Sequence, residues 1–411
     1  MILPEDFPYI TSIYVNDCYT YQNFNIDLIK HQPFSHLILT GKNGSGKSTI
    51  LKYIDNFISN AINSNDLNYR SDVLKNLLAG KTTIPNYGTH KDKESWKNEL
   101  KENERVQTGH LNSCFPILDV AKKEFIYSYV IANRNSQVNE VKSPTKQEEF
   151  ILQLEQSKTS SIFFTKNFKQ FLVNKKVNQA FSQLENNRKE IEDTESFFLK
   201  IEEIFSQVFN DKKLNLVFIK DSYEFLIKLS DGRELTFDIL PDGFSAFLSI
   251  LMDLFVRLDL IRKVVGNNTY NPCGIVLIDE PETHLHISLQ YHVLPILTTL
   301  FPNVQFIVAT HSPAVISSIK NSTIFDLTTK ETLSSDDAIG KSFSELMVSH
   351  FGLDNEFSDF TDDLFEKVNV ILRENKNNIP LRNQQLKAIL KENERYISPT
   401  MRFELEAKIS E

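Results

Sequence analysis

The chain has 411 residues, of which 41% are hydrophobic and 24% charged, and its net charge is −9. These values are typical of a soluble globular protein with a sizeable core and predict two or three domains. The acidic balance argues against broad coating of nucleic acid but leaves room for a local basic groove. No apolar run of about 18 residues occurs, so we expect no membrane span. The three cysteines show no paired spacing, and we expect them to be reduced thiols of a cytoplasmic protein.

The first regular pattern alternates apolar and polar side chains over residues Tyr9–Leu28. It predicts a pair of antiparallel strands. Its aromatic side chains Tyr19, Tyr21 and Phe24 could stack on an adenine ring, but packing within a sheet is the favoured interpretation.

The stretch His36–Thr49, HLILTGKNGSGKST, predicts a buried strand, a glycine-rich turn and a helix that continues to about Ile58. The glycines let the backbone point its N–H groups at a phosphate, and the helix adds its positive end. Lys47 would reach the β- and γ-phosphates, and the Ser48 hydroxyl would be a ligand for Mg²⁺. We therefore expect the loop to hold a nucleotide through Gly41, Asn43, Gly44, Ser45, Gly46, Lys47, Ser48 and Thr49.

The middle of the chain begins with a weakly patterned stretch, residues 59–124, that contains one charged helix candidate, His90–Arg105. A strand is predicted over Phe125–Ala132 from its β-branched and aromatic residues. Apolar residues then recur at spacings of three and four from residue 145 to residue 210. This irregular pattern predicts a packed helical insertion in place of a coiled-coil arm.

Strands are predicted over Leu214–Phe237, with a hairpin turn at Asp231-Gly232. The stretch Ile239–Leu254 follows and contains a long apolar helix. Gly243 opens this helix, so backbone N–H groups at its start are offered to an anion.

The second strong motif begins with the apolar strand Gly274–Ile278, which ends in Asp279-Glu280. An acidic pair at the end of a buried strand is unfavourable unless a cation or water chemistry needs it. Asp279 would hold Mg²⁺, and Glu280 would polarise an attacking water. A further strand, Val304–Ala309, precedes His311, which would hydrogen-bond the γ-phosphate. A metal site at His284 and His286 is the weaker alternative, because no further ligands of suitable spacing are evident.

The motifs GKNGSGKST, IVLIDEPETHLH and FIVATHSP, in this order, resemble the ABC-type ATPase heads of the RecF/SMC/OLD group over about residues 9–325. The resemblance implies an α/β fold: a P-loop NTPase head with a mixed central sheet, flanking helices and an N-terminal antiparallel β part. It also implies that two heads sandwich ATP and Mg²⁺, with Gln137 near the attacking water and Gly243 supplied by the other subunit. The signature segment Leu240–Phe244 departs from the usual pattern, since Pro241 replaces a serine and Ser245 is displaced.

More narrowly, the chain looks like the stand-alone ATPases of anti-phage systems, such as the PtuA-type ATPases of Septu and the AriA-type ATPases of PARIS. Such ATPases form oligomers and hold a separately encoded nuclease. Relatives of the OLD type would continue into a Toprim nuclease domain. Residues 320–411 are short for one and lack an E…DxD arrangement, so we expect no nuclease domain here.

We expect an ATPase head over residues 1–340, with the helical insertion at about 145–210, and a helical extension over residues 341–411. The extension would either cap the head or dock a nuclease. The predicted function is a slow ATPase subunit of a defence complex that controls a nuclease. The alternatives are an ATP-bound scaffold with little turnover and a RecF-like DNA repair ATPase, and nucleic acid stays open as a partner.

Overall fold

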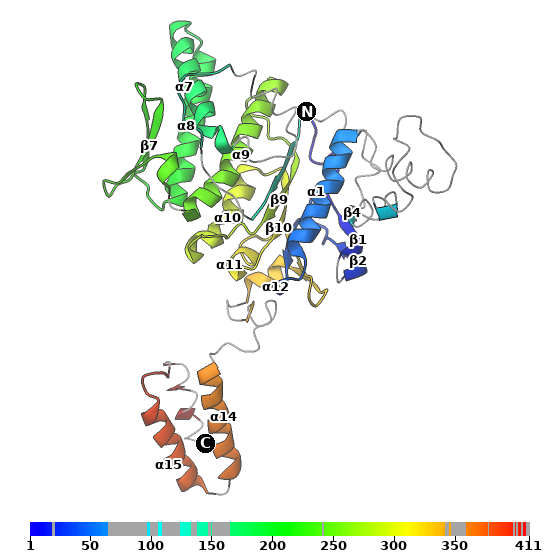
Figure 1. Cartoon of the computed structure of the whole chain (residues 1–411), viewed down its shortest axis with the longest axis vertical. Helices are drawn as coiled ribbons and strands as arrows, with labels where there is room; N and C mark the ends of the chain where they lie inside the picture. Colours follow the sequence, from blue (N-terminus) through cyan, green and yellow to red (C-terminus); the bar gives the residue numbers. More distant parts are fainter. Residues whose placement is uncertain are drawn as a thin grey trace. The chain divides into compact units, whose positions relative to one another are not determined.

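The computed structural model of the chain (Figure 1) describes residues 1–18, 21–64, 97–98, 106–108, 124–132, 138–146, 149, 165–240, 242–341, 345–346, 359–376, 378–397, 399, 402–403 and 406–407. Two residues of interest, Gln137 and Pro241, lie outside this set, as does most of the predicted helix His90–Arg105.

The central sheet of the described residues has the strand order β12-β11-β3-β10-β9-β5. All neighbours in it are parallel except β12, which pairs antiparallel with β11 at the edge. Because the five parallel strands run the same way, their carboxyl ends share one edge of the sheet, where ligands bind in open α/β sheets. The strands are β3 (His36–Thr40), β5 (Ile126–Val130), β9 (Gly274–Asp279), β10 (Val304–Ala309), β11 (Ser322–Asp326) and β12 (Thr332–Ser334).

Both faces of this sheet are covered by helices. Helix α1 (Lys47–Ser64) lies on one face, and α9 (Asp242–Val265) and α10 (Ile287–Leu300) lie on the other (Figure 1). Residues Leu37 and Leu39 of β3 belong to the core under α1. Side chains alternate along a strand, so Ile38 points to the opposite face, and it is equally buried. A strand buried on both faces needs a continuous apolar run, as these strands have.

The N-terminal antiparallel sheet has the order β2-β1-β4 and consists of β1 (Ser12–Cys18), β2 (Tyr21–Asp27) and β4 (Val106–Thr108). The pair β1 and β2 corresponds to the predicted strand pair, whereas β4 was not predicted. The Phe24 ring stacks on Phe325 at a centroid distance of 5.8 Å, which supports sheet packing for this aromatic residue. Tyr19 lies outside the described residues, as does the side chain of Tyr21.

A lobe of helices and strands interrupts the head. Its helices α7 (Phe168–Leu184) and α8 (Arg188–Val208) fall within the predicted helical insertion. A three-stranded antiparallel sheet follows, formed by β6 (Asn215–Ile219), β7 (Glu224–Lys228) and β8 (Glu234–Leu235). The predicted turn lies between β7 and β8, where Gly232 has a φ of +89°. Figure 1 shows α7 and α8 beside α9.

Helix α9 begins within one residue of the predicted opening at Gly243 and extends past Leu254, the last residue of the predicted stretch. A single 3₁₀ turn occupies Phe237–Ile239, and Leu240 is extended with a ψ of 138°. A residue before proline is disfavoured in the α conformation, so the helix starts only after Pro241. It then continues to Val265 and is followed by Gly266 at a φ of +73°, the left-handed conformation that commonly follows a helix.

The chain forms two compact units, Met1–Leu346 and Met347–Glu411. The short helices α11 (Pro313–Ile316) and α12 (Ser335–Ile339) belong to the first. In the second unit, α14 (Asp359–Glu374) and α15 (Ile379–Glu392) pack around Leu364, Val368 and Leu386. The predicted α/β fold class with an N-terminal antiparallel β part is confirmed. Among the described helices, none has both the length and the hydropathy of a membrane span.

Candidate functional site

The loop between β3 and α1 has the backbone that a phosphate cradle requires. Gly41, Gly44 and Gly46 all have positive φ angles, of 129°, 78° and 89°. A side chain at Gly41 would meet Thr328 Oγ1 at 2.9 Å and Asp326 Oδ1 at 3.2 Å, whereas nothing lies within 4 Å of the Cβ position at Gly44. The loop is therefore packed against the end of β11 on one side and open on the other.

Lys47 is buried within this loop, with 5% of its surface exposed. Its amino group donates to the carbonyl oxygen of Gly41 at 3.0 Å. Burial lowers the pKa of Lys47 to about 8, and the nearby carboxylates of Glu280 and Asp279 oppose that shift. A phosphate group entering the loop would therefore meet a cation that is already desolvated and held in place.

The next residue, Ser48, connects this loop to β9. Its hydroxyl donates to Asp279 Oδ1 at 3.0 Å. Asp279 is the last residue of β9 and is 5% exposed. Hydroxyl and carboxylate oxygens are the donors that Mg²⁺ prefers, so this pair fits the predicted metal site. The buried Ser45 hydroxyl also lacks a hydrogen-bond partner among the described residues, as expected of a loop that awaits a polar ligand.

Glu280 follows in a strained turn. It has a φ of +48°, which is uncommon for a residue other than glycine. The Glu280 N–H donates to the carbonyl of Ala309 at 2.8 Å, and the Thr283 hydroxyl donates to the Glu280 carbonyl at 2.9 Å. These bonds fix the backbone and leave the side chain half-buried at the sheet edge. Strain of this kind is often found at functional sites.

His311 follows β10, the strand between β3 and β9. Burial lowers its pKa, and the positive charge of Lys47 lowers it further, so the imidazole is neutral at neutral pH. Because β10 lies between β3 and β9 and runs parallel to both, His311 lies at the same edge of the sheet as Lys47 and Glu280. The structure thus brings the phosphate loop, the acidic pair and His311 together.

Glu282 is a residue of this site that the sequence analysis did not single out. Its Oε1 atom accepts hydrogen bonds from the Thr310 hydroxyl and from the His311 N–H, both at 2.7 Å. Burial raises its pKa although both hydrogen bonds oppose that shift. Glu282 therefore ties the turn after β9 to the segment that carries His311.

Substitution of Glu282 is expected to lower turnover more than nucleotide binding. Glu282→Ala removes the acceptor of two buried donors, each of which costs about 1–3 kcal/mol when left unpaired. His311 would then lose its fixed backbone position. Glu282→Gln keeps an acceptor oxygen and should retain most of the activity. Steady-state ATP turnover and the ATP dissociation constant of both variants test this role, and equal turnover in the two variants would contradict it.

Gln290 and Asp326 also support the site, and neither was predicted. The Ser312 hydroxyl donates to Gln290 Oε1 at 2.6 Å, and Gln290 in turn donates to the carbonyl of Leu285 at 2.9 Å. At the end of β11, Asp326 accepts from the N–H of Thr328, whose hydroxyl accepts from the N–H of Lys42. Through Gln290, the segment after β10 is joined to the segment after β9. Through Thr328, the end of β11 is joined to the phosphate loop.

The other predicted site residues that the structure describes lie either at the edge of the phosphate loop or at the start of α9. Asn43 is exposed and Thr49 is half-buried, both in the phosphate loop region. Gly243 lies at the start of α9, where an added Cβ atom would be 2.4 Å from the carbonyl oxygen of His284. The Ser245 hydroxyl donates to the carbonyl of Leu240 at 3.1 Å. Gly243 thus has a packing role within one chain, while its predicted contact with the ATP of another subunit stays a prediction.

The alternative metal site at His284 and His286 receives no support. The ring of His286 accepts from the N–H of Ser288 and caps α10. His284 lies in the tight turn against Gly243, at a φ of +63°. Within the described residues, no group of three or more potential metal ligands occurs.

Comparisons with known proteins found similarities to several ATPases and related domains. The family "AAA domain, putative AbiEii toxin, Type IV TA system" matches residues 173–317. The "Retron Vc95 probable ATPase" of Vibrio cholerae serotype O1 biovar El Tor is 34% identical over 96 residues, which are 23% of this chain and 18% of that protein. The "Septu protein PtuA" of Bacillus thuringiensis is 24% identical over 285 residues, which are 68% of this chain and 66% of that protein.

Among solved structures, the chain is similar to an SMC head bound to the C-terminal winged-helix domain of ScpA. The sequence identity is 16% and the TM-score is 0.38, over 81% of this chain and 100% of that one. The matched segments span less than two thirds of the two curated relatives. The sequence matches confirm the predicted resemblance to the ATPases of defence systems of the Septu kind.

Proposed function

We propose that this chain, whose head resembles those of the Septu and retron ATPases, binds and hydrolyses ATP in a cytoplasmic anti-phage defence complex. In this proposal the chain assembles into an oligomer and controls a separately encoded nuclease. The observation that carries the ATPase part is the hydrogen bond of 3.0 Å between Ser48 and Asp279, formed beside the buried amino group of Lys47. It joins the two halves of the proposed nucleotide site, which lie 231 residues apart in the sequence.

Each residue has a defined part in the proposed reaction. The phosphate loop and Lys47 bind the phosphate oxygens of ATP and hold them in line with the attacking water. Glu280 accepts a hydrogen bond from that water and raises its nucleophilicity. The neutral His311 donates to the γ-phosphate, and Glu282 keeps it in position. Ser48 and Asp279 would hold Mg²⁺, which neutralises charge on the phosphate oxygens.

A second candidate function, an ATP-bound scaffold with little turnover, is favoured by the signature segment. Pro241 occupies the position of a serine that would contact the γ-phosphate across a pair of heads. Ser245 is the nearest substitute, and its hydroxyl is engaged by the carbonyl of Leu240. A head with this segment would bind ATP and assemble, yet hydrolyse it slowly.

Assembly is expected to depend on nucleotide. Native mass spectrometry of the 47.5 kDa chain should show multiples of the chain mass when ATP and Mg²⁺ are added. The Lys47→Ala variant, which is expected to bind ATP poorly, should assemble less under the same conditions. A monomer mass for the wild type under all nucleotide conditions would contradict the proposed oligomer.

The partner nuclease is tested by co-purification with the products of neighbouring genes. A stable complex with a nuclease is the expected result. If the chain instead retains only DNA repair proteins, the RecF-like alternative replaces the defence role. Neither outcome bears on ATP binding, which is measured separately.

A further inference from the structure

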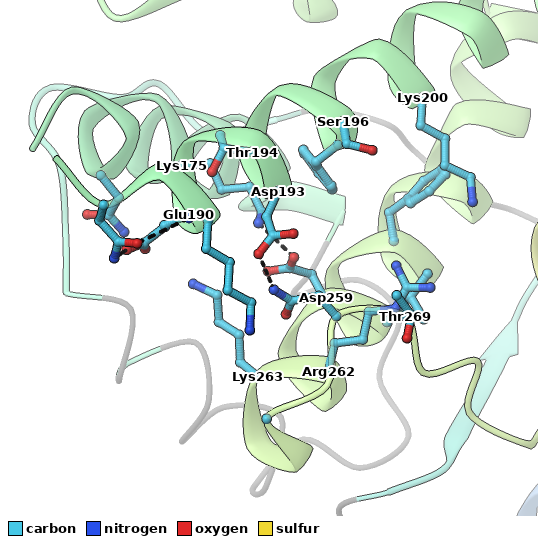
Figure 2. Close-up of a pocket in the computed structure, with 18 residues that line it drawn as sticks. Lys175, Glu190, Asp193, Thr194, Ser196, Lys200, Asp259, Arg262, Lys263 and Thr269 are labelled. Carbon is cyan, nitrogen blue, oxygen red and sulfur yellow. Dashed lines mark hydrogen bonds and ion pairs between the residues drawn. The ribbon is translucent and has the colours of Figure 1, made fainter. Parts of the chain in front are cut away.

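A cavity lies in the lobe, between α8 and the C-terminal end of α9 (Figure 2). Its volume is about 490 Å³, within the range of small-molecule sites. Helix α9 runs from the proposed nucleotide site to this cavity. Gly243 lies in its first turn, and Arg262 lies near its other end, roughly 28 Å further along the helix axis. The cavity is therefore distinct from the site that we propose for ATP.

The charged side chains that line this cavity are more often basic than acidic. The basic residues are Lys175, Lys189, Lys200, Arg262 and Lys263, and the acidic residues are Glu190, Asp193 and Asp259. The acidic groups already have partners. Asp259 forms an ion pair of 2.6 Å with Lys175, Glu190 accepts from Asn187 at 3.2 Å, and Asp193 accepts from Asn268. In a chain of net charge −9, this surplus of positive charge marks the cavity as a place for an anion.

Two of these cations lack an ion-pair partner among the described residues. The Arg262 guanidinium donates to the carbonyl of Tyr270 at 2.8 Å and to the side-chain oxygen of Asn271 at 3.0 Å, both neutral acceptors. Lys200 reaches the same cavity from α8 (Figure 2). Burial lowers the pKa of Arg262, and the carboxylate of Asp259 opposes that shift. Lys200 is exposed, and its pKa is lowered by partial burial and by the charge of Arg262, against the carboxylate of Glu203. An anion between the two cations would offset their mutual repulsion.

The apolar residues that line the cavity are Phe197, Phe255 and Leu258. Phe255 and Leu258 are buried. The Phe197 ring is half-buried and has the Lys175 amino group 4.5 Å from its centroid. The ring or sugar of a nucleotide would extend this cation–π contact, whereas a compact inorganic anion would contact only the cation. The ligand should therefore combine a phosphate with an organic part.

We propose that this cavity binds a phosphate-bearing ligand of about nucleotide size, with Lys200 and Arg262 contacting its phosphate and the Phe197 ring contacting its organic part. The ligand is either a free nucleotide or one unit of a nucleic acid strand, which share this chemistry. Because Gly243 at the start of α9 packs against His284 in the turn after β9, occupancy of the cavity would act on a helix that borders the proposed nucleotide site.

The test uses the full-length chain with the Lys47→Ala substitution, so that the phosphate loop does not contribute to binding. Isothermal titration is carried out with AMP, with pyrophosphate and with a five-residue oligothymidylate. We expect one binding event per chain. Added Lys200→Gln should weaken it about tenfold or more, as for the loss of a charged hydrogen bond. Lys220→Gln, which removes an exposed lysine of the same lobe outside the cavity, should leave it within about twofold.

The probes separate the two sources of the ligand. Stronger binding of AMP than of the oligonucleotide assigns the cavity to a free nucleotide, and the reverse order assigns it to a nucleic acid strand. Absence of binding for all three probes would overturn the proposal. So would equal affinities in the chains with and without Lys200→Gln, once thermal unfolding shows that both are folded.

Discussion

Replacing Lys47 with alanine is expected to reduce ATP affinity about 100-fold or more, because a charged group makes hydrogen bonds worth about 1.5–3 kcal/mol each. The amino group is already buried and faces the loop, so its loss removes the contact that the phosphates would gain. Equilibrium binding of ATP with Mg²⁺ measures the effect. The fold should survive, since alanine removes a desolvated charge from the interior.

Lys42 offers a matched control in the same loop. Its side chain is exposed, while its backbone N–H bonds to Thr328 and does not depend on the side chain. Lys42→Ala should therefore change ATP affinity by less than about threefold, the scale expected for an exposed charge. Unchanged affinity in Lys47→Ala would show that the phosphates bind elsewhere.

Glu280→Gln is expected to lower ATP turnover by about 10²–10⁴, the contribution typical of a general base. Glutamine has the same shape and the same backbone requirement at the positive φ of this turn. It also removes a negative charge near the phosphate loop, so ATP binding should be retained or become tighter. Turnover and binding are measured on the same preparation.

The outcome for Glu280→Gln also separates the two candidate functions. Glu192→Gln changes an exposed carboxylate on α8 and serves as the control. If the wild type hydrolyses ATP and only Glu280→Gln stops it, the enzyme interpretation stands. If the wild type shows no turnover even with its partner nuclease, the scaffold is the better description.

The sequence could predict those parts of the site that are local in the chain. The phosphate loop and the ends of β9 and β10 each follow a mostly apolar strand, and the polar residues that carry chemistry come directly after it. In such segments the strand positions its own terminal side chain. No knowledge of neighbouring strands is needed to expect Lys47, Asp279 and His311 at the edge of a parallel sheet.

The positions of the supporting residues depend on the order of the strands in the sheet, which cannot be read from the sequence. Asp326 lies beside the phosphate loop only because β11 pairs with β3, although β11 follows β3 by almost 300 residues in the chain. Glu282 reaches His311 only because β9 pairs with β10. The start of α9 is a different case, because a helix opened by Gly243 is predicted from the sequence and the extended conformation of Leu240 follows from the proline after it.

The close approach of Gly243 to the His284 carbonyl has a consequence for how relatives should be compared. No other residue type has room at this position unless the turn after β9 shifts. Evolution would retain a glycine here in any relative with the same turn, whether or not that relative consumes ATP. A glycine at the start of this helix is therefore a marker of the fold. Competence for hydrolysis should be sought in the residues before it, where this chain has Leu240 and Pro241.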